Sequence, residues 1–307
     1  MNNRSHSGSS SVDRSQRGTE SGAMRPCFHM DIVTSKKVRL NGLWWGPKKA
    51  RTVVIMVHGL TASAFSMGRL RDALIDGKTA VLTFNNRGFE QLSEVKRGSG
   101  RETVWVPAGA GREVFTDCVD DIQGAINAAR KAGVSAIYLA GHSTGCQKIV
   151  YWASRGKRTG VVKGIVLLAP LSDYAGTAEK YKGALSHARR LVKVRKGREL
   201  MPQKFGHWFP IEAQRFVSLY GRESKEEIFS YASGRTPTAL KRVKLPIFAL
   251  FAGSDEHADR PVERIAEWFR QSLKRSDSVR IIPRAGHSFR GAEASLAAKV
   301  RVFMKVG

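Results

Sequence analysis

Short apolar runs alternate with amphipathic segments along most of the chain. The run at 53–58 is continuous, which is typical of a strand buried on both faces. Further strands are expected at 38–45, 80–84, 136–140, 164–169, 246–251 and 279–282. Apolar residues at three- and four-residue spacing predict helices over 112–132 and 261–273, and a helix continues over 149–154. This alternation predicts an α/β fold with a mostly parallel central sheet and helices on both faces.

The alternation also divides the chain into parts. Residues 1–26 are rich in Ser, Gly and Arg and are predicted to be a disordered tail. Residues 171–243 contain no clear core strand, and this is long for a connection in such a sheet. We therefore predict a core formed by 27–170 and 244–307, with 171–243 inserted as a helical lid.

The charge is strongly positive: 52 Lys and Arg against 26 Asp and Glu give a net +26. Such a charge attracts anions, but a positive surface that keeps the chain soluble explains it as well. No nucleic-acid-binding motif appears, and the basic residues are not interleaved with aromatic ones, so we expect no specific nucleic-acid partner.

Basic residues crowd one part of the predicted lid. They are Lys180, Lys182, Arg189, Arg190, Lys193, Arg195, Lys196, Arg198 and Lys204. Two interpretations remain open: a solvated helix face, or a charged cleft that attracts an anionic substrate.

Neither a membrane span nor a secretion signal is expected. No apolar run reaches the roughly 18 residues that cross a bilayer, and the first ten residues, MNNRSHSGSS, contain no apolar signal core. The three cysteines are scattered and form no CxxC pair, which predicts neither a metal site nor a disulfide framework. Free thiols favour a reducing compartment, so we expect a cytoplasmic protein. The sequence does not indicate an oligomeric state.

The strongest chemical signal is GHSTG at 141–145, a G-x-S-x-G motif that lies between a predicted strand and a predicted helix. This context is typical of a nucleophile elbow, in which a tight turn raises Ser143 above the sheet edge. The turn requires small residues two positions before and after the serine, and Gly141 and Gly145 meet that requirement.

A base and an acid follow in the chain. His287 comes directly after the last predicted strand, and Asp255 follows the strand before it, so both are expected at the carboxyl edge of the sheet. The order Ser143, Asp255, His287 matches the catalytic triad of this arrangement. Glu256 and Asp259 are the competing acids. We expect Glu256 to point elsewhere and Asp259 to cap the helix after it.

An oxyanion hole completes the predicted site. One donor is the backbone N–H of Thr144, and the other is the N–H of Leu60 in the loop after the strand at 53–58. His58 is expected to stabilise that loop and His142 to pack beneath the nucleophile. Cys146 is expected to be a small buried helix residue.

Taken together, these motifs resemble the α/β-hydrolase superfamily. They are HGL at 58–60, NNRGF at 85–89, GHSTG at 141–145, GSD at 253–255 and GHSF at 286–289. The string GHSTGCQ at 141–147, with SDE at 254–256, is similar to the siderophore-esterase-like branch. The chain departs from the Asp-x-Arg-Gly-x-Gly segment of many members, since it has NNRGFE at 85–90.

The resemblance implies the α/β-hydrolase fold and a serine hydrolase that acts on a small-molecule carboxylic ester, with no cofactor and no metal. Three alternatives use the same residues: acyl transfer, cleavage of a thioester or peptide, and non-catalytic binding of an anion on the hydrolase fold. An anionic ester is one candidate substrate. The sequence does not select the ester.

Overall fold

A central sheet organises this computed structural model, which describes residues 24–156, 160–181, 183–274 and 279–306. Within these ranges the sheet has ten strands in the order β10-β9-β8-β7-β3-β4-β2-β5-β6, with β1 paired to β2. The strands are β1 (Cys27–Val33), β2 (Val38–Trp45), β3 (Thr52–Val57), β4 (Thr79–Phe84), β5 (Ser93–Arg97), β6 (Val104–Ala108), β7 (Ala136–His142), β8 (Val162–Leu168), β9 (Ile247–Ala252) and β10 (Val279–Ile282). The predicted tail falls almost wholly outside the described residues.

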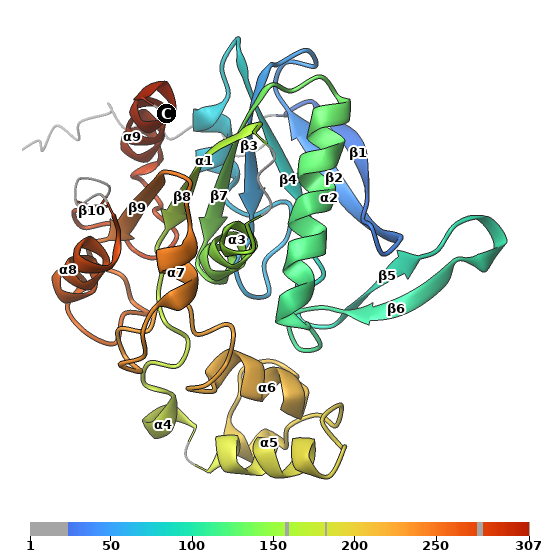
Figure 1. Cartoon of the computed structure of the whole chain (residues 1–307), viewed down its shortest axis with the longest axis vertical. Helices are drawn as coiled ribbons and strands as arrows, with labels where there is room; N and C mark the ends of the chain where they lie inside the picture. The colour runs from blue at the N-terminus through green and yellow to red at the C-terminus, as the bar shows by residue number, and fades with distance from the viewer. Residues whose placement is uncertain (1–23, 157–159, 182, 275–278, 307) are drawn as a thin grey trace, which may run out of the picture.

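The strands divide into a parallel and an antiparallel part. β4, β3, β7, β8, β9 and β10 pair in parallel, and all their carboxyl ends therefore meet at one edge. β1, β2, β5 and β6 pair antiparallel on one side, and β5 and β6 form an arm that projects from the body (Figure 1). The predicted α/β class with a mostly parallel central sheet is confirmed.

Helices cover both faces of the sheet. The described helices are α1 (Gly68–Leu74), α2 (Cys118–Lys131), α3 (Thr144–Ser154), α4 (Thr177–Lys180), α5 (Ala184–Lys193), α6 (Ala213–Tyr220), α7 (Thr238–Arg242), α8 (Val262–Ser272) and α9 (Glu293–Val306). Helices α2, α3, α7 and α8 bury apolar residues on one face, and α1 and α9 do so on the other. Alternate residues of β3 feed these two cores, since Ile55 points to the first and Val54 to the second.

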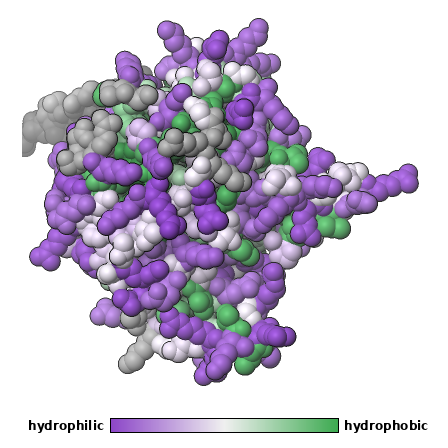
Figure 2. Space-filling model, viewed as in Figure 1, coloured by the Kyte–Doolittle hydropathy of each residue, from purple (hydrophilic) through white to green (hydrophobic). Residues whose placement is uncertain are grey.

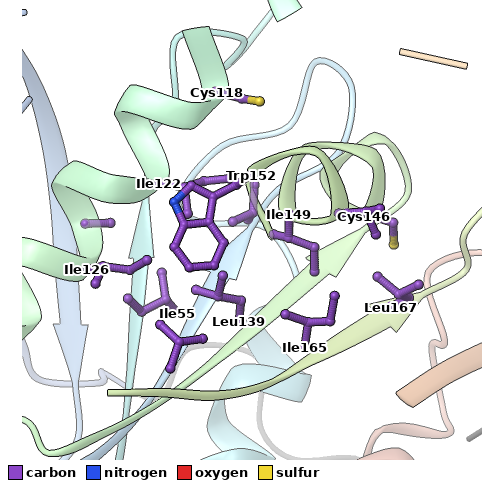
Figure 3. Packing of buried hydrophobic residues seen from close by; sticks show 14 of the residues in the cluster. Ile55, Cys118, Ile122, Ile126, Leu139, Cys146, Ile149, Trp152, Ile165 and Leu167 are labelled. Carbon is purple, nitrogen blue, oxygen red and sulfur yellow. The ribbon is translucent and has the colours of Figure 1, made fainter. Parts of the chain in front are cut away.

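The larger core forms between α2, α3 and the sheet. Figure 3 shows Trp152 of α3 lying among Ile122 and Ile126 of α2 and Leu139 of β7. Trp152 is 1% exposed and donates its indole N–H to Gln123 at 3.3 Å. This packing fixes α3, and with it the turn that precedes α3, against the carboxyl edge of the sheet.

The predicted helix over 112–132 begins later than expected, at Cys118. Val114 fitted the helical spacing, but it is 46% exposed and lies in the loop before the helix. The side chain of Glu113 turns inward instead, where it pairs with Lys148 and Arg215. Those long-range ion pairs, rather than helix periodicity, set the conformation of this segment.

The insertion between β8 and β9 has a small core of its own. Helices α4, α5 and α6 gather beyond the carboxyl edge of the sheet, at the bottom of Figure 1. Tyr181, Phe209, Phe216 and Tyr220 are buried together there. Helix α7 differs, because its Leu240 joins the main core beside α3.

The surface is largely hydrophilic on the face that Figure 2 shows, with smaller hydrophobic patches. On the arm, Trp105 is 61% exposed and its neighbour Val104 is 50% exposed. None of the helices in the described ranges combines the length and the apolar character that crossing a membrane requires.

Candidate active site

Ser143 lies at the turn between β7 and α3. Its backbone has φ 53° and ψ −125°, a conformation that costs a non-glycine residue about 1–3 kcal/mol. The Ser143 N–H donates to Leu168 O at 3.0 Å, which ties the turn to β8. This is the strained strand-to-helix turn that presents a nucleophile at the sheet edge.

The glycines of the motif are required by close backbone contacts. A Cβ atom on Gly141 would lie 2.5 Å from the carbonyl carbon of Gly145, and one on Gly145 would lie 2.2 Å from Val57 O. Both distances are far below van der Waals contact, and the atoms met are backbone atoms. The turn therefore accepts no side chain at either position, as the sequence predicted.

His287 and Asp255 are joined by a short hydrogen bond. The imidazole Nδ1 lies 2.8 Å from Asp255 Oδ2 and 3.0 Å from Oδ1. A carboxylate only accepts, so Nδ1–H is the donor, and Nε2 is left as the nitrogen that can take a proton. Both residues are 9% exposed, and His287 lines the same cavity as Ser143.

The competing acids have other contacts. Glu256 Oε2 accepts the backbone N–H of His287 at 2.8 Å, and this hydrogen bond lowers the pKa of Glu256. Glu256 thus holds the main chain of His287 and not its imidazole. Asp259 pairs with Arg260 at 2.7 Å, and α8 has Pro261 at its N-cap without a side-chain cap. The expectation that Asp259 caps this helix is therefore wrong, because its carboxylate forms an ion pair with Arg260 instead.

The loop that carries Leu60 approaches Ser143 closely. A Cβ atom on Gly59 would lie 3.0 Å from Ser143 Cβ, so only glycine fits here without displacing the loop. His58 donates from Nδ1 to Gly59 O at 2.9 Å, which supports the predicted stabilising role of His58. Across the described residues, neither the Leu60 N–H nor the Thr144 N–H donates a hydrogen bond. Both residues line the cavity beside Ser143.

His142 and Cys146 lie close to Ser143 in the chain. His142 Nε2 lies 2.9 Å from His287 O, and the two imidazole rings are 4.9 Å apart. Burial, with a smaller contribution from His287, lowers the pKa of His142 to about 4, so its ring is neutral at neutral pH. Cys146 is fully buried, and burial raises the pKa of its thiol, as befits a structural helix residue.

The remaining cysteines do not suggest other chemistry. Cys27 is exposed, Cys118 is buried, and both are free thiols like Cys146. In the part of the chain that the structure describes, no group of three or more His, Cys, Asp or Glu is placed to hold a metal ion.

Ser143 and His287 open into a cavity of about 610 Å³, a size typical of sites for small molecules. The elbow, Leu60 and His257 line it from the core of the fold, and Tyr181, Trp208 and Tyr220 line it from the insertion. The sequence analysis did not single out these aromatic residues, because no strand register places them.

Asp173 was also missed, although a signal existed. It follows β8 at the carboxyl edge of the sheet, the same rule that located Asp255. Asp173 lines the cavity and accepts a hydrogen bond from Gln147 Nε2 at 2.7 Å. Burial and the nearby Glu226 raise the pKa of Asp173 well above its usual value.

The basic residues of the insertion lie mostly away from this cavity. Lys180 lines it, whereas the others in the described ranges do not and are exposed. Lys182 lies outside the described residues. The nine residues therefore do not form a single basic lining, and attraction of an anionic ester stays a prediction.

A buried ion cluster ties the insertion to the core. Glu113 lies 2.6 Å from Lys148 of α3 and 3.1 Å from Arg215 of α6. Arg215, fully buried, also pairs with Glu226, and it donates to Ala110 O at 2.9 Å. Burial alone would raise the pKa of Glu113, but the two cations outweigh it and lower that pKa. The insertion is therefore held at its base by charges that cannot separate without cost.

Comparison with known families places the chain. The DUF1749 family, described as a protein of unknown function, matches residues 109–306. The chain belongs to this family. The match begins before α2 and ends in α9, so it includes Ser143, Asp255 and His287. A search of curated proteins found no match.

Solved structures similar to this DUF1749 protein share its fold. The siderophore hydrolase EstB from Aspergillus fumigatus is 16% identical, with 93% of this chain and 98% of that chain covered and a TM-score of 0.67. Est1E from Butyrivibrio proteoclasticus, solved with ferulic acid, is 17% identical over 90% and 97%, with a TM-score of 0.60. The carboxylesterase CesB from Bacillus subtilis is 17% identical over 93% of each chain, with a TM-score of 0.55. The predicted α/β-hydrolase fold is confirmed.

Proposed function

We propose that this protein is a serine hydrolase that cleaves a carboxylic ester through Ser143, His287 and Asp255. One observation carries the proposal. A serine held in a strained elbow shares a cavity with a histidine whose Nδ1 is hydrogen-bonded to a buried carboxylate at 2.8 Å. The names of the similar structures, a siderophore hydrolase and a carboxylesterase, favour an ester as the bond that is cleaved.

In the proposed reaction, His287 Nε2 takes the Ser143 proton while Oγ attacks the ester carbonyl. Asp255 keeps the imidazole in the required tautomer and stabilises its charged form. The Leu60 and Thr144 N–H groups donate to the oxyanion, and each contributes roughly 3 kcal/mol in the transition state. His287 then protonates the leaving alcohol, and water resolves the acyl-enzyme by the same steps. This sequence requires neither a metal nor an organic cofactor.

The insertion acts as a lid in this proposal, and the lining of the cavity by its Tyr181, Trp208 and Tyr220 together with the elbow supports this role. The buried ion pairs of Glu113 hold the insertion to the core, so we infer a lid in a fixed position and not one that hinges open.

Fluorophosphonate labelling combined with an ester panel tests the proposal. We expect the wild type to be labelled at Ser143 and to turn over esters, and Ser143→Ala to lose labelling and about 10⁴-fold or more in turnover. Ser135→Ala is the matched control, because Ser135 is exposed just before the opposite end of the same strand, β7. A Ser143→Ala protein that keeps a tenth of wild-type turnover would exclude Ser143 as the nucleophile.

The panel includes thioesters, peptides and alternative acyl acceptors. Faster turnover of one of these than of every ester would move the assignment to thioester or peptide cleavage or to acyl transfer. A protein that binds the esters without labelling or turnover would be a binding protein on this fold.

A further inference from the structure

Several polar groups around the cavity lack partners although they are buried. Within the described ranges, no hydrogen-bond partner exists for the Tyr181 hydroxyl, Thr144 Oγ1 or Gln147 Oε1. Buried polar atoms are nearly always hydrogen-bonded, because leaving one without a partner costs about 1–3 kcal/mol. Tyr181 is only 4% exposed, and it lines the cavity. Its missing partner is therefore expected to come from what fills the cavity.

Asp173 stands in the same cavity with half of its carboxyl group engaged. Gln147 donates to Oδ2, and Oδ1 has no partner among the described residues. Gln147 also donates to Leu171 O at 3.0 Å, and Thr177 donates to Asp173 O at 2.9 Å, so the position of Asp173 is fixed from two sides. A carboxyl group held in this way leaves Oδ1 available to a bound ligand.

The neighbouring aromatic residues fix Tyr181 as well. Its ring lies 5.1 Å from that of Tyr220 and 5.5 Å from that of Phe216. The Tyr220 hydroxyl is already engaged by His207 Nε2 at 3.0 Å. Burial and the interaction with the Tyr181 hydroxyl raise the pKa of Tyr220, but the Tyr181 hydroxyl makes no well-formed hydrogen bond within the described protein.

We propose that Asp173 and Tyr181 form a polar subsite that binds a hydroxyl group of the substrate, so that the enzyme prefers hydroxyl-bearing esters. The inference rests on the proposed esterase function and specifies the substrate class of the same cavity.

A hydroxyl group fits this pair better than a charged group does. The raised pKa of Asp173 lets it hold a proton at a pH where an exposed Asp has lost it, and a protonated carboxyl group both donates and accepts, as a hydroxyl does. A carboxylate would meet the negative charges of Glu226 and Glu227, which act on Asp173 and which Arg215 and Lys148 offset only in part, since the pKa of Asp173 remains raised. An ammonium group would meet Lys180, which lines the same cavity.

The test compares esters that differ only in one terminal group. The acyl pair is the methyl esters of ω-hydroxyhexanoate and heptanoate, and the alcohol pair is ω-hydroxybutyl and pentyl butyrate. We expect kcat/KM for the hydroxyl ester to exceed that for its alkyl partner about tenfold or more in at least one pair, as one well-made hydrogen bond allows. Monomethyl pimelate, the anionic counterpart of the acyl pair, is expected to be the poorest acyl substrate.

Variants assign the preference to the subsite. Tyr181→Phe and Asp173→Asn are each expected to reduce the hydroxyl-to-alkyl ratio of kcat/KM about fivefold or more. Tyr181→Phe removes a hydroxyl that makes no well-formed hydrogen bond among the described residues, so its melting temperature should lie close to that of the wild type. Tyr138→Phe is the matched control, because its hydroxyl donates to Met304 O at 2.7 Å on the face of α9, away from the cavity. It should leave the ratio unchanged.

The outcomes separate the two proposals. Equal turnover of hydroxyl and alkyl esters in both pairs, or a ratio that survives Tyr181→Phe, would overturn the subsite while the esterase function stands. Preference for monomethyl pimelate would overturn the hydroxyl subsite and indicate that the cavity binds an anionic group of the substrate instead. Absence of turnover for every ester, together with absence of fluorophosphonate labelling, would overturn the esterase function and the subsite with it.

Discussion

Replacing Asp255 by Asn tests the triad most sharply, because the structure fixes the orientation of the new amide. Asp255 Oδ1 accepts the backbone N–H of His257 at 3.0 Å, so the Asn carbonyl oxygen is expected to remain there. The amide NH₂ then occupies the Oδ2 position, 2.8 Å from His287 Nδ1. Because NH₂ only donates, Nδ1 must accept, and the ring proton moves to Nε2. That tautomer cannot take the Ser143 proton.

The expected loss in kcat is about 10⁴-fold, as for other triads in the wrong tautomer. Glu256→Gln is the matched control, because a Gln oxygen can still accept the His287 N–H. It should cost less than about tenfold. Steady-state kinetics on one chromogenic ester give both values, and circular dichroism confirms folding. The reasoning is refuted if Asp255→Asn stays within tenfold of wild type, or if Glu256→Gln is the more damaging change.

Three further predictions follow from the same geometry. Gly59→Ala should reduce kcat about 10²-fold by displacing an oxyanion donor, whereas Gly77→Ala, which meets nothing within 4 Å, should not. Arg215→Met should lower the free energy of unfolding by about 3–5 kcal/mol in urea titrations, because the buried Glu226 loses its cation and Glu113 keeps only Lys148. The exposed Arg198→Met should lower it by less than about 1 kcal/mol. The free energy of unfolding should also fall as the pH is lowered from 6.5 to about 4, because the unfolded chain protonates His142 while the folded protein keeps it neutral. His142→Asn should reduce this dependence of the unfolding free energy on pH, and an unchanged dependence would contradict the reasoning.

The sequence predicted the buried parts of the fold best. Ala136–His142 and Ile247–Ala252 are buried along almost their whole length and lie within two residues of the strands predicted at 136–140 and 246–251. The strands that were missed are exposed on one side or paired only in a hairpin. Cys27–Val33 is largely exposed, and β5, with the sequence SEVKR, buries only Val95. Such strands carry too little apolar pattern to be recognised, and their pairing partners define them.

The candidate site divides in the same way. Ser143, Asp255 and His287 each follow a strand whose apolar run is visible, so the sheet edge alone placed them together, although their catalytic roles stay a prediction. Glu113 and Arg215 could not be connected in this way. They are 102 positions apart, and no local pattern shows that one lies against the other. Ion pairs of this kind appear only when the tertiary structure is known.

These two classes of residue depend on each other in the proposed mechanism. The elbow and His287 follow strands of the sheet, which fixes the reacting atoms. Tyr181 comes from the insertion, whose described residues make no hydrogen bond to residues 141–145. A wall of this kind selects substrates only if its position is held, because ordering it at binding would cost affinity. The Glu113 and Arg215 pair supplies that constraint by joining α6 of the insertion to the core. Arg215→Met should therefore reduce the hydroxyl-to-alkyl ratio of kcat/KM as well as the stability of the fold. Removal of a surface ion pair of the insertion should change neither by much.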